Sequence, residues 1–195
     1  YINGIEDIMR VQERLLVYIL RQVKKDGQRE LKLLGKDLVI PRLPFPRINY
    51  IDACKLLKVK PTTDIGTELE RKLAKIIKSK FKTDSFFLTN LPNDFTKFYA
   101  MHDGKIGRYV DLIYNNNEIS SGGQREHRYD LLIQQIKDKK LKPKEFEFYT
   151  TPFKYGAPPH GGFGMGIDRL VAFILDLPNI REAVLFPRDV DRIGP

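Results

Sequence analysis

The chain has 195 residues, of which 42% are hydrophobic and 30% are charged, and 34 basic against 25 acidic residues give a formal net charge of +9. This composition is typical of a soluble globular protein with one domain, and because no apolar run approaches the length of a bilayer, it excludes a membrane-spanning protein. The single cysteine, Cys54, excludes an internal disulfide and fits a reducing, cytoplasmic compartment.

The first 60 residues contain two predicted helices. Apolar residues recur at helical spacing between positions 5 and 25, and Gly27 is placed to end that helix. Residues 31–46 hold three prolines, so we expect extended chain there and no central strand. Asn49 is the predicted cap of a second, short helix in which Cys54 fills the core.

The next segment predicts a helix followed by two strands. Thr67–Glu70 has the form of a capping box, which predicts a helix that continues to about Lys80. The aromatic run Ser85–Thr89 suits a buried strand, and Phe98–Met101 suits its neighbour. These two strands indicate an antiparallel sheet.

The middle of the chain predicts a β-hairpin. The strand-like segments Tyr109–Tyr114 and Glu118–Ser121 flank three asparagines at 115–117, and asparagine tolerates the left-handed backbone of a tight turn.

The last third returns mostly to helical patterns. We expect a helix over residues 129–140, a short helix or strand over 146–150, and an apolar helix over 170–177 that follows a glycine-rich strand. Strands in hairpins with helices to one side predict an α+β domain with an antiparallel sheet.

The glycine-rich strand ends in an arginine. Four glycines, at positions 161, 162, 164 and 166, precede Arg169. Because glycine has no Cβ, a flat or anionic ligand can lie close to such a backbone, where the arginine would meet it. Taken alone, the pattern could equally mark a tight turn of a sheet.

A second motif, Glu118–Arg128, combines oxygen donors with glycines. Glu118 and Ser120 share one face of a strand, and Ser121 joins Glu118 only if the backbone bends, which the two following glycines make easy. One carboxylate and one hydroxyl are sufficient for a hard cation that nucleotide phosphates also hold.

Arg125 lies in the same motif and suggests a carboxylate ligand. Its guanidinium group matches a carboxylate with two parallel hydrogen bonds and stays charged at any working pH. The alternative interpretation is a surface arginine paired with Glu126 or Asp130.

These residues carry a resemblance to a known family. The segment 161–177 resembles motif 3 of the class II aminoacyl-tRNA synthetases, and Leu185–Asp189 with the final Arg192–Pro195 is similar to aspartyl-tRNA synthetases of the archaeal and eukaryotic type. The resemblance covers nearly the whole chain, residues 1–195. It implies the C-terminal part of a class II catalytic domain, an antiparallel sheet flanked by helices.

The resemblance also implies roles for the motif residues. Glu118 binds ATP and Mg²⁺ and shares the catalytic role with Arg169, while Ser121 binds Mg²⁺ and lies near the amino acid. Arg125 holds the side chain of the aspartate substrate. ATP is contacted by Gly166, Ile167, Asp168 and Arg169. Asp168 departs from the family, which often has glutamate there, so any carboxylate contact has a shorter arm.

The implied function is that of an aspartate–tRNA ligase, a homodimer that activates L-aspartate with ATP and Mg²⁺ and transfers it to tRNA(Asp). The net positive charge is compatible with such a polyanionic partner. Two alternatives stay open. One is an asparaginyl-tRNA synthetase or an asparagine-forming paralogue, which shares Glu118, Arg125 and Arg169, and the other is a non-catalytic synthetase-like module that binds nucleotide or RNA.

The sequence shows no signal-peptide pattern. Because it does not begin with methionine, we expect it to be a fragment of a longer protein. By resemblance, the anticodon-binding domain, motif 1 and motif 2 are absent. Motif 2 supplies the arginine that holds the α-phosphate of ATP, so the isolated chain is expected to be inactive.

Overall fold

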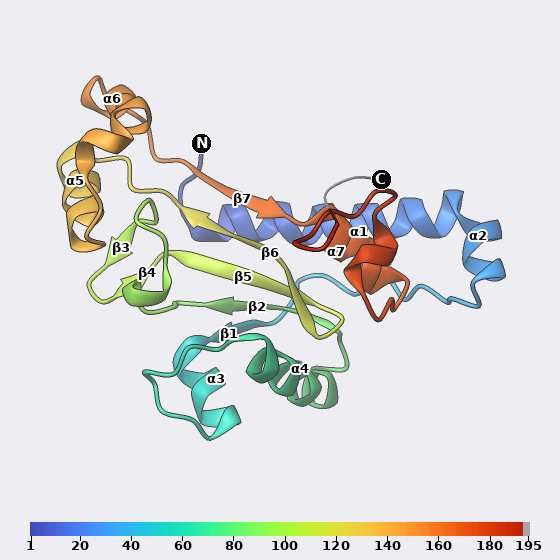
Figure 1. Ribbon diagram of the computed structural model, residues 1–195. Coiled ribbons are helices and arrows are strands. Elements are labelled where there is room, and N and C mark those ends of the chain that lie inside the picture. Colours follow the sequence, from blue (N-terminus) through green and yellow to red (C-terminus); the bar gives the residue numbers. More distant parts are fainter. Residues whose placement is uncertain (193–195) are drawn as a thin grey trace.

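The computed structural model describes residues 1–192 (Figure 1). Of the final segment 192–195 that carries part of the family resemblance, residues 193–195 therefore lie outside the described residues. Its centre is a five-stranded sheet in the order β1-β2-β5-β6-β7. The strands are β1 (Arg47–Asn49), β2 (Ser85–Thr89), β5 (Tyr109–Tyr114), β6 (Asn117–Gln124) and β7 (Gly161–Met165). The α+β prediction is confirmed, with two departures. Strand β1 pairs with β2 in parallel, whereas the other pairs of this sheet are antiparallel. Helices also lie on both faces of the sheet and not on one side only.

The described residues form seven α-helices. They are α1 (Ile5–Asp26), α2 (Gln28–Leu33), α3 (Tyr50–Leu57), α4 (Thr67–Phe81), α5 (Tyr129–Asp138), α6 (Glu147–Lys154) and α7 (Ile167–Ile174). Short connecting elements are the hairpin β3 (His102–Asp103) with β4 (Ile106–Gly107) and the 3₁₀ turns η1 (Asn93–Phe95), η2 (Pro143–Phe146) and η3 (Ile180–Ala183). No helix in the described part of the chain is long and apolar enough to cross a membrane.

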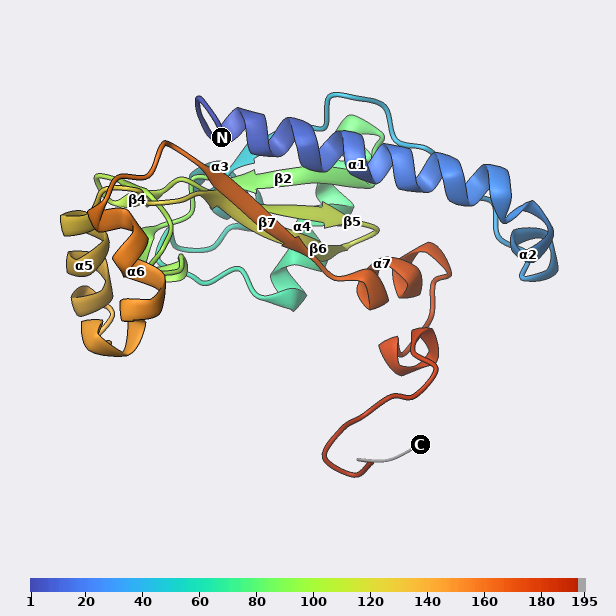
Figure 2. The same ribbon diagram turned by 90° about the horizontal axis from the view of Figure 1, so that it is seen from above.

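The sheet is covered on both faces. Helix α1 runs along one face, and α3 and α4 lie against the other, as Figure 2 shows from above. Strand β2 explains why both faces close: Phe87 packs with the α1 cluster, whereas Phe86 and Leu88 pack with the α3 and α4 cluster. All three side chains are buried, and full burial of each contributes roughly 1.5–3 kcal/mol.

Several local predictions are confirmed. Gly27 closes α1, with its N–H bonded to the carbonyl of Val23, and the Asn49 side chain caps α3 by accepting from the N–H of Ile51. The hairpin between β5 and β6 turns through Asn115 and Asn116, whose φ angles are 45° and 69°. Cys54 is buried in the core, at 1% exposure.

Other predictions are wrong in detail. The capping box is absent, because Thr67 is already helical and Gly66 occupies the cap position without a side-chain bond. Helix α2 lies partly inside the segment expected to be extended. Residues Phe98–Met101 do not form a strand beside β2; Ala100 makes only one isolated bridge, to Arg125.

The ends of the later helices also differ from the sequence prediction. The segment expected as a short helix or strand is helix α6, and α7 begins three residues before the predicted position 170. Phe98 belongs to a separate small cluster with α5 and α6, where its ring lies 4.9 Å from that of Phe146. Aromatic packing between helices therefore explains a run that looked like a strand.

Candidate functional site

A β-bulge in β6 determines which side chains of the second motif share a face. Leu112 pairs with Ser120 and Ile113 pairs with Glu118, so Ile119 is the extra residue between them. Ile119 and Ser120 are both buried toward α1, where the Ser120 hydroxyl donates to the side-chain oxygen of Gln12 at 2.9 Å. The bend that the sequence required is therefore present, although it lies at Ile119 and not at the glycines.

Beyond the bulge, Glu118 and Ser121 line one cavity of about 450 Å³ together with Arg169. The cavity lies between the beginning of α4, the strands β5 and β6, and the beginning of α7. Two acidic residues that the sequence analysis did not single out, Asp111 and Glu70, face the same space. The predicted residues Glu118, Ser121 and Arg169 therefore line one cavity, although Arg169 is 51 positions from Glu118 in the sequence.

Burial makes this cavity unusual electrostatically. Burial raises the pKa of Asp111 to about 7, an effect that the hydrogen bond from Ser121 partly offsets and the Glu118 charge reinforces. Burial likewise raises the pKa of Glu70 to about 7, with repulsion from Glu118 as the next cause. A cation at this position would relieve the repulsion among the carboxylates.

Arg169 lies at the mouth of the cavity and is only loosely paired. Its Nη1 atom is 3.6 Å from the Glu118 carboxylate and 3.4 Å from the Glu118 carbonyl. Both side chains are partly exposed, so the pair contributes less than about 1 kcal/mol. The guanidinium group is therefore free to contact a ligand.

The other predicted ATP-contacting residues lie at the N-terminus of α7. Gly166 is its cap, and Ile167, Asp168 and Arg169 form the first turn. All four are exposed. The N–H groups of a first turn lack partners within their own helix, and the helix dipole favours a negative group there.

Strand β7 presents a surface without side chains, here called the glycine floor, on the sheet face that carries Ser121. Gly162, Gly164 and Gly166 alternate with residues that turn toward α1, where a Cβ at Gly161 would meet Ile8. A Cβ at Gly164 would have no neighbour within 4 Å, and the stem of Arg169 lies beside Gly166. A flat ligand can therefore lie directly on this strand.

Arg125 stands apart from the cavity, four residues beyond Ser121 and roughly 13 Å away along the strand direction. Its guanidinium carbon lies 4.8 Å from the centre of the Tyr99 ring. Within the described residues it makes no ion pair: Glu126 is bonded by Arg128 through two contacts of 2.9 Å, and Asp130 makes no pair with Arg125. The pairing with Glu126 or Asp130 that the alternative interpretation required is therefore not formed among the described residues.

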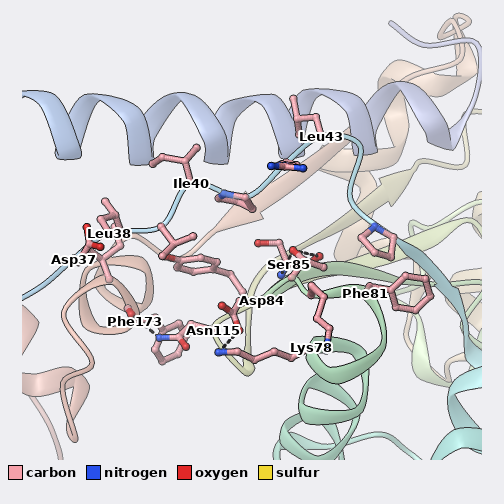
Figure 3. A pocket seen from close by; sticks show the side chains of 18 of the residues that line it. Asp37, Leu38, Ile40, Leu43, Lys78, Phe81, Asp84, Ser85, Asn115 and Phe173 are labelled. Atoms are coloured by element: carbon pink, nitrogen blue, oxygen red, sulfur yellow. Dashed lines mark hydrogen bonds and ion pairs between the residues drawn. The ribbon is translucent and has the colours of Figure 1, made fainter.

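A larger cavity of about 880 Å³ lies elsewhere, between residues 37–46, the end of α4 and the end of α7 (Figure 3). Its carboxylates are already paired with lysines: Asp84 with Lys78 at 2.8 Å, and Asp176 with Lys36 at 3.2 Å. None of the motif residues lines it. We place the functional site at the smaller cavity because the motif chemistry converges there.

The sequence analysis missed Asp111 and Glu70 for different reasons. Asp111 is the one charged residue in the apolar strand Tyr109–Tyr114, a signal that was present and was not used. Glu70 was explained as part of a capping box that does not form. Among the described residues, no group of three or more His, Cys, Asp or Glu side chains is arranged to hold a metal ion.

Comparison with known proteins gives the family. Residues 1–190 match the family model described as tRNA synthetases class II (D, K and N). The aspartate–tRNA(Asp) ligase of Thermococcus kodakarensis is 45% identical over 203 aligned residues, covering 100% of this chain and 46% of that protein. The aspartate–tRNA(Asp/Asn) ligase of Methanopyrus kandleri is 41% identical, with the same coverage of both chains.

Solved structures agree with this match. Aspartyl-tRNA synthetase of Entamoeba histolytica superposes with a TM-score of 0.92 at 30% identity, covering 100% of this chain and 42% of that one. Asparaginyl-tRNA synthetase of Pyrococcus horikoshii superposes with a TM-score of 0.88 at 34% identity, covering 97% and 47%.

The chain therefore belongs to the class II aminoacyl-tRNA synthetases of the aspartate, lysine and asparagine group. Within that group, the two archaeal relatives above carry the names of aspartate–tRNA ligases. The chain spans less than half the length of these relatives.

Proposed function

We propose that this chain forms the C-terminal part of the catalytic domain of an aspartate–tRNA ligase, which activates L-aspartate with ATP and transfers it to tRNA(Asp). The observation that carries the proposal is Arg125. It is a guanidinium group without an ion-pair partner among the described residues, and it follows strand β6, which carries Glu118 and Ser121. The names of the archaeal relatives support the same activity.

In the proposed complex, ATP lies on the glycine floor of β7. The guanidinium group of Arg169 stacks on the adenine, where cation–π attraction and charge act together. The exposed start of α7, at the cap Gly166 and at Ile167 and Asp168, approaches the nucleotide, and the N–H groups of Ile167 and Asp168 lack partners within the helix. Three residues of this turn and one strand thus hold the nucleotide without a large side chain beneath it.

Mg²⁺ fits the oxygen donors that share the cavity with Arg169. Glu118 supplies a carboxylate and Ser121 a hydroxyl, and Asp111, bonded to Ser121, adds a third oxygen donor. Magnesium keeps several of its waters and binds through few protein oxygens plus substrate phosphates. When bound, the ion neutralises phosphate charge, while Glu118 and Ser121 fix where the triphosphate lies.

The chemistry requires positioning more than a protein nucleophile. A carboxylate oxygen of aspartate attacks the α-phosphorus of ATP, a P–O bond forms to give the aspartyl-adenylate, and pyrophosphate leaves. A hydroxyl of the terminal ribose of tRNA then attacks the acyl carbon, and AMP leaves with the bonding electrons. Arg125 orients the substrate side chain, and Arg169 compensates negative charge near the phosphates.

The relatives extend beyond this chain, so further parts of the enzyme belong to the proposal. We assign the anticodon-binding domain, the motif 1 helix of the homodimer interface and the motif 2 arginine to the portion of the relatives that the chain does not cover. Cytoplasmic protein synthesis is the corresponding setting.

Asparagine is the competing substrate, since an asparaginyl-tRNA synthetase is among the structures that superpose closely. Pyrophosphate exchange with ATP distinguishes them: protein extended to the length of the relatives is assayed with aspartate and with asparagine. Aspartate-dependent exchange supports the proposal, and exchange with asparagine alone refutes it. A protein that binds ATP and supports exchange with neither amino acid would favour the non-catalytic module.

A further inference from the structure

The space in front of Arg125 is kept open by a missing side chain. A Cβ added to Gly162 would lie 3.4 Å from Nη2, 3.6 Å from Nε and 3.9 Å from Cζ of Arg125. Both nitrogens are closer to that point than the carbon between them. The point therefore lies in front of the Nε–Nη2 edge of the guanidinium group and not over its flat face.

That edge is the one a carboxylate can use. Two parallel N–H donors point outward from it, and a carboxylate bound there has its oxygens about 2.8 Å from the nitrogens. A methyl group at position 162 and a bound carboxylate would claim the same space. The three atoms nearest to a Cβ at Gly162 all belong to Arg125.

The guanidinium group is also held in orientation. The Tyr99 ring covers it at 4.8 Å, and Tyr99 is itself packed edge-on against Phe98 at 5.4 Å. The backbone on each side is tied: the N–H of Arg125 donates to the carbonyl of His160 at 2.9 Å, and the N–H of Glu126 donates to the carbonyl of Tyr99 at 2.9 Å. The edge toward Gly162 is therefore a fixed feature of the fold.

We propose that Gly162 is a specificity-determining position, where the absence of a side chain creates the space in which the substrate side-chain carboxylate meets the Nε–Nη2 edge of Arg125. This inference rests on the proposed function, because it takes Arg125 as the group that binds the amino acid. Tyr99 is a positioning residue in the same arrangement. The amino-acid end of the substrate accordingly lies over Gly162 and the nucleotide end toward Gly166, at opposite ends of one strand.

Gly162→Ala tests the inference in protein extended to the length of the relatives. The KM for aspartate is expected to rise roughly tenfold to a hundredfold, because a charge-assisted pair is lost, while the KM for ATP stays unchanged. Gly164→Ala, two residues along the same face, is expected to affect ATP more than aspartate. Gly4→Ala, at the N-cap of α1 where an added Cβ would meet no atom within 4 Å, controls for the substitution itself.

A Gly162→Ala protein with the parental KM for aspartate overturns the inference, and so does an equal rise in both KM values. If the parent shows no aspartate-dependent exchange, the proposed function fails first, and the two failures are thereby distinguished. Thermal melting checks that the variant folds, which we expect because the added methyl group would lie 3.4 Å or more from its nearest neighbours, an ordinary van der Waals distance.

Tyr99 provides a second, independent measurement that does not alter the strand. Tyr99→Phe retains the ring beneath Arg125 and should keep the aspartate KM, whereas Tyr99→Leu should raise it and leave the KM for ATP unchanged. Equal aspartate KM values for the two variants, both parental, would contradict the fixed orientation of Arg125.

Discussion

The hydroxyl of Ser121 donates a hydrogen bond to the carboxylate of Asp111, its direct partner across the β5–β6 ladder. One residue comes from the motif that the sequence analysis selected, and the other from a strand that it treated as part of a hairpin. Their contact connects the proposed magnesium ligand to a carboxylate whose pKa is raised by burial to about 7.

This raised pKa predicts a dependence of stability on pH. Asp111 and Glu70 have folded-state pKa values of about 7, above the ordinary values of 3.8 and 4.5. Between those limits the native state binds more protons than the unfolded state, so the free energy of unfolding should fall as pH rises toward 7. Each unit of pKa shift corresponds to about 1.4 kcal/mol, which makes the slope measurable.

Thermal or urea unfolding checks this expectation in metal-free buffer. The measurements are made at several pH values between 5 and 8, which include the pKa of Asp111 and Glu70. Asp111→Asn and Glu70→Gln should each flatten the slope, since each removes one buried charge. Asp52→Asn, at an exposed residue paired with Lys55, should retain it. A parental slope in both buried variants would contradict the assignment.

The local elements could be predicted from the sequence because neighbouring residues determine them. Helix α1 follows from its apolar spacing, and the Asn115–Asn116 turn follows from residues that accept positive φ. The site could be predicted only in part. Whether Ser121 joins Glu118 depends on a bulge at Ile119, which is fixed by pairing with another strand and by burial against α1.

The residues that were missed have the same physical explanation. Glu70 and Asp111 come from a helix and a strand about 40 positions apart, and only the packing of α4 on the sheet brings them to one cavity. Phe98 looked like a strand residue because its aromatic neighbours suit a sheet, whereas it packs with Phe146 and Tyr149. A hydrophobic pattern predicts that a residue such as Phe98 is buried, but it does not predict which residues it packs against.

Glu118 provides a prediction about magnesium. Glu118→Gln keeps the size of the side chain and removes its charge. The magnesium concentration for half-maximal exchange should therefore rise roughly several-fold, because one carboxylate ligand is lost. The side chain is partly exposed, so the melting temperature should barely change. Glu68→Gln, on the exposed face of α4, is the matched control. Identical magnesium titrations for parent and Glu118→Gln would argue against the role.

Arg125 provides a prediction about amino-acid selection. Arg125→Leu should leave a substrate carboxylate unpaired in the pocket and cost several kcal/mol, roughly a hundredfold or more in kcat/KM for aspartate. Binding of ATP, measured by calorimetry in the absence of aspartate, should be unaffected because Arg125 lies outside the nucleotide cavity. Arg10→Leu, at an exposed position of α1, controls for the loss of one positive charge. Parental kinetics for aspartate would refute the assignment of Arg125.

The last prediction concerns the 195-residue chain on its own, which spans 46% of the length of its archaeal relatives. It retains Glu118, Ser121, Arg125 and Arg169, so it carries the residues proposed to bind ATP, Mg²⁺ and aspartate. We propose above that the arginine for the α-phosphate belongs to motif 2, in the portion of the relatives that the chain does not cover. Because removal of one well-placed donor to developing charge costs on the order of a hundredfold or more in rate, the chain alone should not support exchange.

Aspartate-dependent exchange of pyrophosphate with ATP, measured on purified protein of verified mass 22.7 kDa, decides the matter when the extended protein is assayed beside it. If the proposed homodimer forms through motif 1, the isolated chain should leave its own side of that interface uncovered, so we expect it to associate poorly or aggregate in light scattering. Exchange by the isolated chain at a rate near that of the extended protein would contradict the prediction, because the residues described here would then suffice to stabilise the transferring phosphate.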